Sequence, residues 1–281
     1  MKGQRLGLFA AVLVASPVIA GITYSVLGAT GIVGPGQDGF SLDHVGRVIA
    51  DGATWSGLMW TLWVAFASTA LAFVLAIVVA TVLRGDRRGD RLARAFAIFS
   101  LPFPHVVAAL CAVLLLSQSG VLARLAHTAQ LQASPSDMPA LVYDRWGIGL
   151  IIALTWKEFS FLVFIAFSVL ARRGAILEET ARSLGAGAIR TFRVATLPSL
   201  WRGLLPAAIA VFTFVAGNYE ATVLLAPSSP LALPLLTMEG HTDPSFGRRA
   251  EAYVLVLIAA IVSAGAVIVH EWVTSRIEAA D

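Results

Sequence analysis

The sequence predicts an all-α membrane protein with six transmembrane helices. Three observations predict this fold class: six apolar stretches of membrane length, few charged residues, and basic residues confined to the short segments between the stretches. Charged residues make up 13% of the chain, against roughly 25% in soluble domains. This is too little charge for a water-exposed surface, so we expect a single transmembrane domain over residues 1–281.

Each predicted span has the length that a bilayer requires. A hydrocarbon core about 30 Å thick is crossed by about 20 apolar residues in a helix. Pro102 and Pro104 lie early in the third stretch, where they are expected to kink or shorten the inner end of the helix. The neighbouring His105 is expected to be a packed, hydrogen-bonded residue, and no metal site is predicted. The predicted spans are 6–27, 57–83, 95–117, 148–171, 204–225 and 253–272.

The positions of the basic residues predict the orientation. Of the 20 Lys and Arg residues, 14 lie on one side of the membrane, five on the other, and Lys157 lies within a span. The positive-inside rule places both termini and the loop 172–203 in the cytoplasm of a bacterial inner membrane. Because apolar sequence continues to Leu27, the first span is expected to be an uncleaved anchor and not a signal peptide. This segregation indicates membrane insertion and not nucleic-acid binding.

The loop 172–203 has more pattern than a simple connector. Apolar residues spaced by four, three and four predict a short helix with a narrow apolar stripe, at Leu177, Ala181, Leu184 and Ala188. Gly185 follows where a sharp change of direction is expected. Two interpretations remain open: a rigid knob that fills a groove on a soluble partner, or an amphipathic helix lying on lipid headgroups.

This loop resembles the cytoplasmic motif of binding-protein-dependent ABC import permeases. In that motif Glu-Ala-Ala is followed by three residues, Gly, nine residues, and Ile-x-Leu-Pro. Here Glu179-Thr180-Ala181 precedes Gly185 by three residues, and Ala195-Thr196-Leu197-Pro198 follows after nine more. Thr180 and Ala195 depart from the pattern, conservatively in polarity or size. Six spans, with this loop between the fourth and fifth, are also the family's layout, so the resemblance implies the type I importer permease fold.

The resemblance implies a permease subunit that couples transport to ATP hydrolysis and is not itself an enzyme. The expected partners are two ATP-binding subunits, a second permease (identical or homologous) and an exported solute-binding protein. The chain has no Gly-x-x-x-x-Gly-Lys-Ser/Thr phosphate loop, so ATP is expected to bind another chain and no cofactor is expected here. The residues implied to contact the ATPase are Glu178, Glu179, Ala181, Leu184, Gly185, Leu197 and Pro198.

Polar residues inside the spans are candidates for the solute pathway. Ionisable groups are costly in a bilayer and usually face a cavity or a partner. One interpretation is a structural ion pair between Lys157 and Glu220, and the other is a pathway for a polar or cationic solute. On a continuous helix, Glu220 would lie about 24 Å beyond Leu204, in the outer half of the membrane. The candidate pathway residues are Lys157, Glu158, Asn218, Tyr219 and Glu220.

Three further hypotheses concern the function of the chain. The sequence LALPLLTMEG after the fifth span resembles the branch that handles polyamines, thiamine, ferric iron and oxyanions. The alternative is an ion-coupled carrier or channel without an ATPase, with Lys157, Glu158 and Glu220 as the relay; a non-transporting scaffold is a third.

Overall fold

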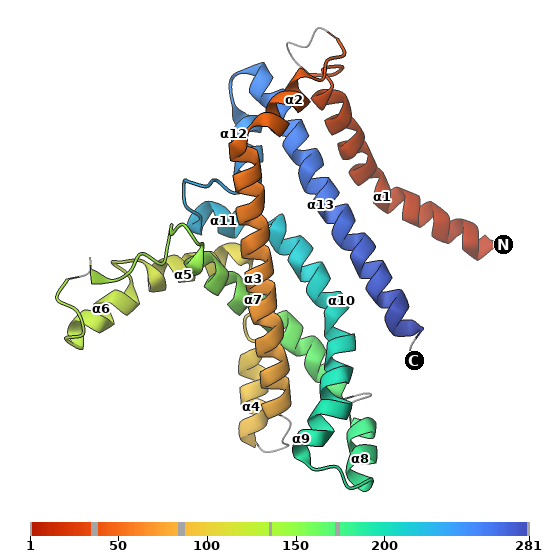
Figure 1. Ribbon diagram of the computed structural model, residues 1–281, viewed down its shortest axis with the longest axis vertical. Coiled ribbons are helices and arrows are strands. Elements are labelled where there is room, and N and C mark those ends of the chain that lie inside the picture. The colour runs from red at the N-terminus through yellow and green to blue at the C-terminus, as the bar shows by residue number, and fades with distance from the viewer. Residues whose placement is uncertain (1, 35–38, 84–87, 135–136, 172–174, 280–281) are drawn as a thin grey trace. The chain divides into compact units, whose positions relative to one another are not determined.

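The computed structural model describes residues 2–34, 39–83, 88–134, 137–171 and 175–279, and it is helical almost throughout (Figure 1). Six helices within these ranges are long and apolar enough to cross a membrane, which confirms the predicted number. They are Val12–Ala29, Gly52–Val82, His105–Thr128, Ile148–Val169, Ala188–Ala216 and Phe246–Ile277.

Contacts divide the chain into two compact units. The first comprises residues 1–59 and 231–264, and the second comprises residues 60–230 and 265–281. The helices α3 (Gly52–Val82) and α13 (Phe246–Glu278) contribute to both units. That the chain is one permease domain stays a prediction.

The first unit contains α1 (Lys2–Ala29), α2 (Asp43–Ala50), α12 (Leu233–Thr242) and the adjoining parts of α3 and α13. Tyr24 and Tyr253 stack edge to face, with ring centroids 5.5 Å apart. A Cβ at Gly28 would collide with the Tyr253 ring, so this glycine permits the close approach of α1 to α13. Arg47 of α2 forms an ion pair with Glu251 near the start of α13, with Nε 2.8 Å from Oε1.

The second unit is built around α7 (Ile148–Val169), which packs against α5, α10 and α11. Its largest fully buried side chains include Leu150, Leu154 and Leu162. The remaining elements of this unit are α4 (Arg88–Ala97), α5 (His105–Leu116), α6 (Val121–Thr128), α8 (Ala175–Ser183), α9 (Ala188–Thr191), the π-helical segment η3 (Phe192–Thr196), α10 (Leu197–Ala216) and α11 (Tyr219–Leu225).

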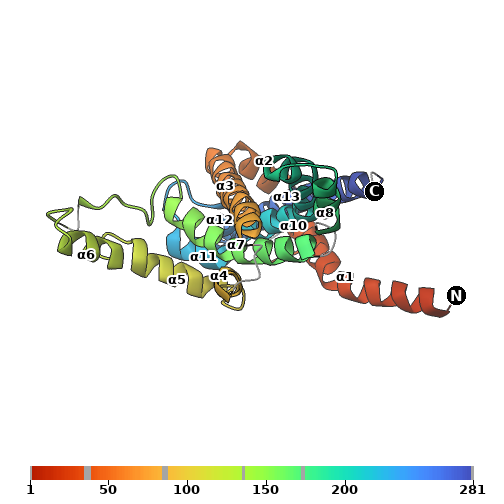
Figure 2. The same ribbon diagram turned by 90° about the horizontal axis from the view of Figure 1, so that it is seen from below.

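Two predicted spans contain a break in the helix. The third, predicted at 95–117, begins at His105, because residues 98–104 with their two prolines separate α4 from α5. Figures 1 and 2 show α4 turned steeply away from the line of α5 and α6. The fifth, predicted as continuous over 204–225, ends at Ala216 and is followed by the separate helix α11.

Candidate functional site

The segment 175–203 folds as a short helix, a sharp turn and a return into α10. The turn lies at Gly185, whose φ of +83° is in the left-handed region. The amide of Ala186 donates to the carbonyl of Ala181 at 3.0 Å, and the amide of Gly185 donates to the carbonyl of Arg182 at 2.9 Å. These two bonds form a Schellman motif, in which glycine takes the left-handed position that ends a helix. The motif glycine is therefore explained by its backbone conformation.

A buried carboxylate fastens α8 to the returning chain. Glu178 is 9% exposed, and its Oε1 accepts a hydrogen bond from Thr196 Oγ1 at 2.5 Å. Its other oxygen lies 3.7 Å from Arg182 Nη2. A hydroxyl bound to a carboxylate makes one of the stronger hydrogen bonds in proteins. This bond joins α8 to η3 across 18 residues of chain.

The adjacent acid, Glu179, lies in a different environment. Its side chain is exposed and, within the described residues, has no hydrogen-bond or ion-pair partner. Two neighbouring acids that the sequence could not tell apart are therefore distinguished by structure. Glu178 braces the segment, whereas the Glu179 carboxylate is exposed.

We expect Thr196→Val to lower the free energy of unfolding of this subunit by about 1–3 kcal/mol, because it removes the hydroxyl that donates to the buried Glu178 carboxylate. Thermal unfolding of the purified protein measures this loss. Thr180→Val is the matched control, since the exposed Thr180 hydroxyl donates only to the Ile176 carbonyl within its own helix. Equal losses in the two variants would contradict the assigned brace.

The predicted apolar stripe is correct only in part. Leu177 and Ala181 lie on α8, but the helix ends before Leu184, which is 83% exposed, and Ala188 begins α9 after the turn. The prediction of one helical stripe through all four residues is therefore wrong. The physical reason is the Gly185 turn, which reverses the chain after the first half of the stripe.

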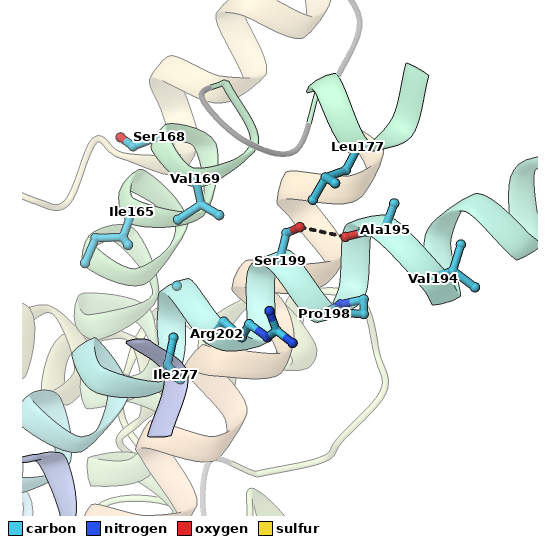
Figure 3. Close-up of a pocket in the computed structure, with 11 residues that line it drawn as sticks. Ile165, Ser168, Val169, Leu177, Val194, Ala195, Pro198, Ser199, Arg202 and Ile277 are labelled. Atoms are coloured by element: carbon cyan, nitrogen blue, oxygen red, sulfur yellow. Dashed lines mark hydrogen bonds between the residues drawn. The ribbon is translucent and has the colours of Figure 1, made fainter. Parts of the chain in front are cut away.

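A groove of about 660 Å³ lies beside the N-terminal end of α10 (Figure 3). Leu197 and Pro198 begin α10 directly after η3, and the amide of Leu197 donates to the carbonyl of Phe192. The groove separates α8 from α10, with Leu177 of α8 and Ser199 of α10 both in its lining. The helix α8 packs instead on η3 and α9. The groove is lined by Ile165, Ser168, Val169, Leu177, Val194, Ala195, Pro198, Ser199, Arg202, Gly203 and Ile277.

Lys157 and Glu158, both candidate pathway residues, are buried on α7. They are 7% and 6% exposed. Lys157 Nζ donates to the carbonyl of Leu101 at 3.1 Å, and Glu158 Oε1 lies 2.7 Å from His105 Nε2. A charged side chain at the centre of a bilayer costs about 2.5–3.5 kcal/mol on insertion scales, so such partners are expected. His105 is hydrogen-bonded, as predicted.

The expected ion pair between Lys157 and Glu220, two residues that the structure describes, is not formed. Lys157 is directed to the Leu101 carbonyl, whereas Glu220 is exposed in α11, beyond the end of α10. Among the described residues, the side chains of Lys157 and Glu158 bind Leu101 and His105, and neither binds Glu220. Across the ranges that the structure describes, no three His, Cys, Asp or Glu side chains form a group that could hold a metal ion.

The polar sequence around residue 218 ends one helix and begins another. Asn218 is 7% exposed and caps α11, with its Oδ1 accepting from the amide of Ala221 at 2.9 Å. Such a cap satisfies an amide that the first turn leaves free. Because the chain is interrupted here, the depth of Glu220 inferred from one continuous helix does not hold. Tyr219 and Glu220 remain exposed at the start of α11.

Several residues of these sites were missed in the sequence. Ser100 and Ser160 are nearly fully buried, with their hydroxyl oxygens 2.5 Å apart, and Thr196 holds Glu178. The two prolines before His105 were the available signal, because they free helix carbonyls that need donors from elsewhere. Nothing comparable marked Ser160 or Thr196, whose partners lie far away in the sequence.

Comparison with known proteins shows likeness in sequence and in fold. The family model described as "Binding-protein-dependent transport system inner membrane component" matches residues 72–279. The inner membrane ABC transporter permease protein YnjC of Escherichia coli is 26% identical over 178 residues, which are 61% of this chain and 33% of that protein. A probable sulfate transport system permease protein, cysT of Chlorella vulgaris, is 32% identical over 83 residues, 30% of this chain and 31% of the relative. The chain thus spans about a third of the length of these relatives.

The fold is similar to that of a bacterial ABC transporter involved in the import of the acidic polysaccharide alginate. The TM-score is 0.72 at 18% identity, covering 98% of this chain and 97% of the other. At this level of identity the likeness concerns the fold, and it agrees with the predicted type I importer architecture.

Proposed function

Because this chain belongs to the family of binding-protein-dependent transport system inner membrane components, we propose that it forms half of a solute pathway driven by a separate ATP-binding subunit. As a member of that family the chain is an importer permease subunit of the inner membrane. The coupling to ATP hydrolysis, the cargo and the assembly are parts of the proposal. ATP would be bound and hydrolysed by the partner, and this chain would need no cofactor.

The observation that carries the coupling proposal is the construction of the segment 175–203. Its helix α8 is stopped by the Gly185 turn and fastened by the Glu178–Thr196 bond, so it is presented as a fixed projection. Glu179 stands exposed on this projection, as do Leu177 and Leu184. A carboxylate beside exposed apolar side chains suits a cleft on a soluble protein with a basic or amide-lined wall. The alternative, that α8 lies on anionic headgroups, is less favourable because Glu178 and Glu179 would be repelled.

The assembly follows from the same assignment. We propose two ATP-binding subunits, each contacting one coupling segment through Glu179, Ala181, Leu184, Gly185, Leu197 and Pro198, with the buried Glu178 holding the segment in shape. A second permease would complete the pathway, and an exported binding protein would deliver the solute. The distribution of basic residues supports cytoplasmic termini and a cytoplasmic segment 172–203.

For the solute pathway we propose the exposed start of α11, with Tyr219 and Glu220 facing the solute. Asn218, Lys157 and Glu158 would belong to the wall behind it, since each is buried and has a partner. A carboxylate and a phenol favour a small polar or cationic solute. The sulfate and alginate carriers among the similar proteins are named for anions, so the charge of the cargo is a sharp test of this assignment.

Purification of the intact complex from its native membrane tests the main proposal. We expect an ATP-binding protein and an exported solute-binding protein to co-purify with this chain, and mass spectrometry of the solute bound to the latter to identify the cargo. Transport by this chain alone in liposomes, without ATP, would instead establish an ion-coupled carrier.

We expect Glu220→Gln to raise the half-saturating concentration of the identified solute about tenfold, with protein levels unchanged, if the cargo is cationic. Uptake into proteoliposomes measures this change. Glu239→Gln is the matched control, an exposed carboxylate on α12. Unchanged affinity and rate in Glu220→Gln would remove this residue from the pathway.

A further inference from the structure

Residues 98–104, between α4 and α5, leave backbone carbonyls without their usual helical donors. In a continuous helix the carbonyl of Ala97 would accept from the amide of Leu101. Here that amide donates to the carbonyl of Ile98 at 3.0 Å. The two prolines within this break supply no amide hydrogens. In a membrane such carbonyls must find donors within the protein, since lipid offers none.

One turn of α7, residues 156–160, supplies those donors. Ser160 Oγ donates to the carbonyl of Ala97 at 2.8 Å, and Lys157 Nζ donates to the carbonyl of Leu101 at 3.1 Å. The hydroxyl of Ser100 lies 2.5 Å from that of Ser160. We call residues 156–160 the polar turn; it thus binds the last residue of α4 and the middle of the break.

The same turn also reaches the first residue of α5. Glu158 Oε1 lies 2.7 Å from His105 Nε2. The His105 ring also lies beside the ring of Phe214 of α10, with ring centroids 4.8 Å apart. Phe214 precedes Gly217, at the end of α10, by three residues. Three helices therefore meet at His105: α5, α7 and α10.

We infer that the polar turn is a latch that sets the position of α5, and through His105 the end of α10, during transport. Lys157 and Glu158 are positioning residues that make no contact with solute: Lys157 acts on the backbone of the break, and Glu158 acts on the side chain of His105. Their burial and their contacts with Leu101 and His105 account for two charges inside a span without a pathway role.

The functional part of this inference rests on the proposed function. α11, which carries Tyr219 and Glu220, packs on both α5 and α7. A displacement of α5 would therefore change the surroundings of these two exposed residues. The latch links the ATP-driven movement of the helices to the proposed solute pathway.

Cysteine labelling measures whether the latch holds α5. The reporter is Ala112→Cys, a position on α5 that is 7% exposed, in a Cys111→Ser background. We expect Lys157→Met to raise the rate of N-ethylmaleimide labelling roughly tenfold, because it removes the charged donor to the Leu101 carbonyl. Lys157→Arg restores the donor and the slow rate. Phe161→Leu, an exposed site one turn along α7, leaves the rate unchanged. If Lys157→Met does not fold, Ser160→Ala serves as the milder variant.

A second reporter, Tyr219→Cys, separates a positioning role from a purely structural one. In vesicles holding the complete complex, we expect ATP to change its labelling rate, Lys157→Met to abolish that change, and Lys157→Arg to restore it. Unchanged Ala112→Cys labelling in Lys157→Met would overturn the latch. Faster Ala112→Cys labelling with the ATP response intact at Tyr219→Cys would overturn the positioning role. If ATP does not change the labelling rate of Tyr219→Cys in the complex that retains Lys157, the proposed function fails. The labelling rates of Ala112→Cys still decide whether the latch exists.

Discussion

Gly185→Val is expected to uncouple ATP hydrolysis from transport, with uptake falling tenfold or more while membrane insertion is retained. The φ of +83° at this position places a side chain in the left-handed region, which costs about 1–2 kcal/mol for ordinary residues and more for β-branched ones. The helix end would relax to another backbone conformation and move α8. Because a Cβ added at Gly185 would meet nothing within 4 Å, the effect would arise from the backbone and not from collision within the subunit.

Two variants make this prediction specific. Gly185→Asn should retain much of the coupling, since asparagine tolerates the left-handed conformation better than other residues. Gly187→Ala should behave as the unsubstituted protein, because Gly187 has a φ of −67° and open space around it. Uptake and ATPase rates of the reconstituted complex provide the measurement. A Gly187→Ala defect as large as that of Gly185→Val would show that the turn conformation is not the cause.

Glu179→Lys is expected to reduce recovery of the ATP-binding subunit in co-purification by tenfold or more. Reversing an interface charge costs several kcal/mol when the partner surface is complementary, and each 1.4 kcal/mol corresponds to about a factor of ten in affinity. Since the Glu179 side chain is exposed, the fold of the subunit should be unaffected. Thermal unfolding checks this second expectation.

The matched control is Glu271→Lys, which makes the same charge change at a residue on α13 whose side chain is 77% exposed. It should leave recovery of the ATP-binding subunit unchanged. Glu178→Lys provides the contrast, because it should lower the unfolding temperature by breaking the bond to Thr196. Normal recovery of the ATPase with Glu179→Lys would exclude this carboxylate from the docking surface.

The membrane fold could be predicted from the sequence with few errors, and the errors have a common cause. Hydropathy reports the length of apolar sequence, not the continuity of the helix. The stretch 204–225 is apolar enough to cross a bilayer, yet it is interrupted at Gly217 and Asn218, where the asparagine caps a new helix. The prolines at 102 and 104 were expected to disrupt the third span. The separate amphipathic helix α4, which ends before them at Ala97, was not predicted.

The sequence by itself determined the all-helical membrane architecture, the number of spans and the presence of the importer motif. These properties depend on local composition and spacing, which a single chain displays directly. Only the tertiary structure decided which polar residues are exposed and which are partnered. Glu178 and Glu179 are adjacent and chemically alike, but the first is bound to Thr196 and the second is open. Lys157 and Glu158 likewise bind residues more than 50 positions away, and such long-range hydrogen bonds form only when packing brings distant helices together, which no local pattern records.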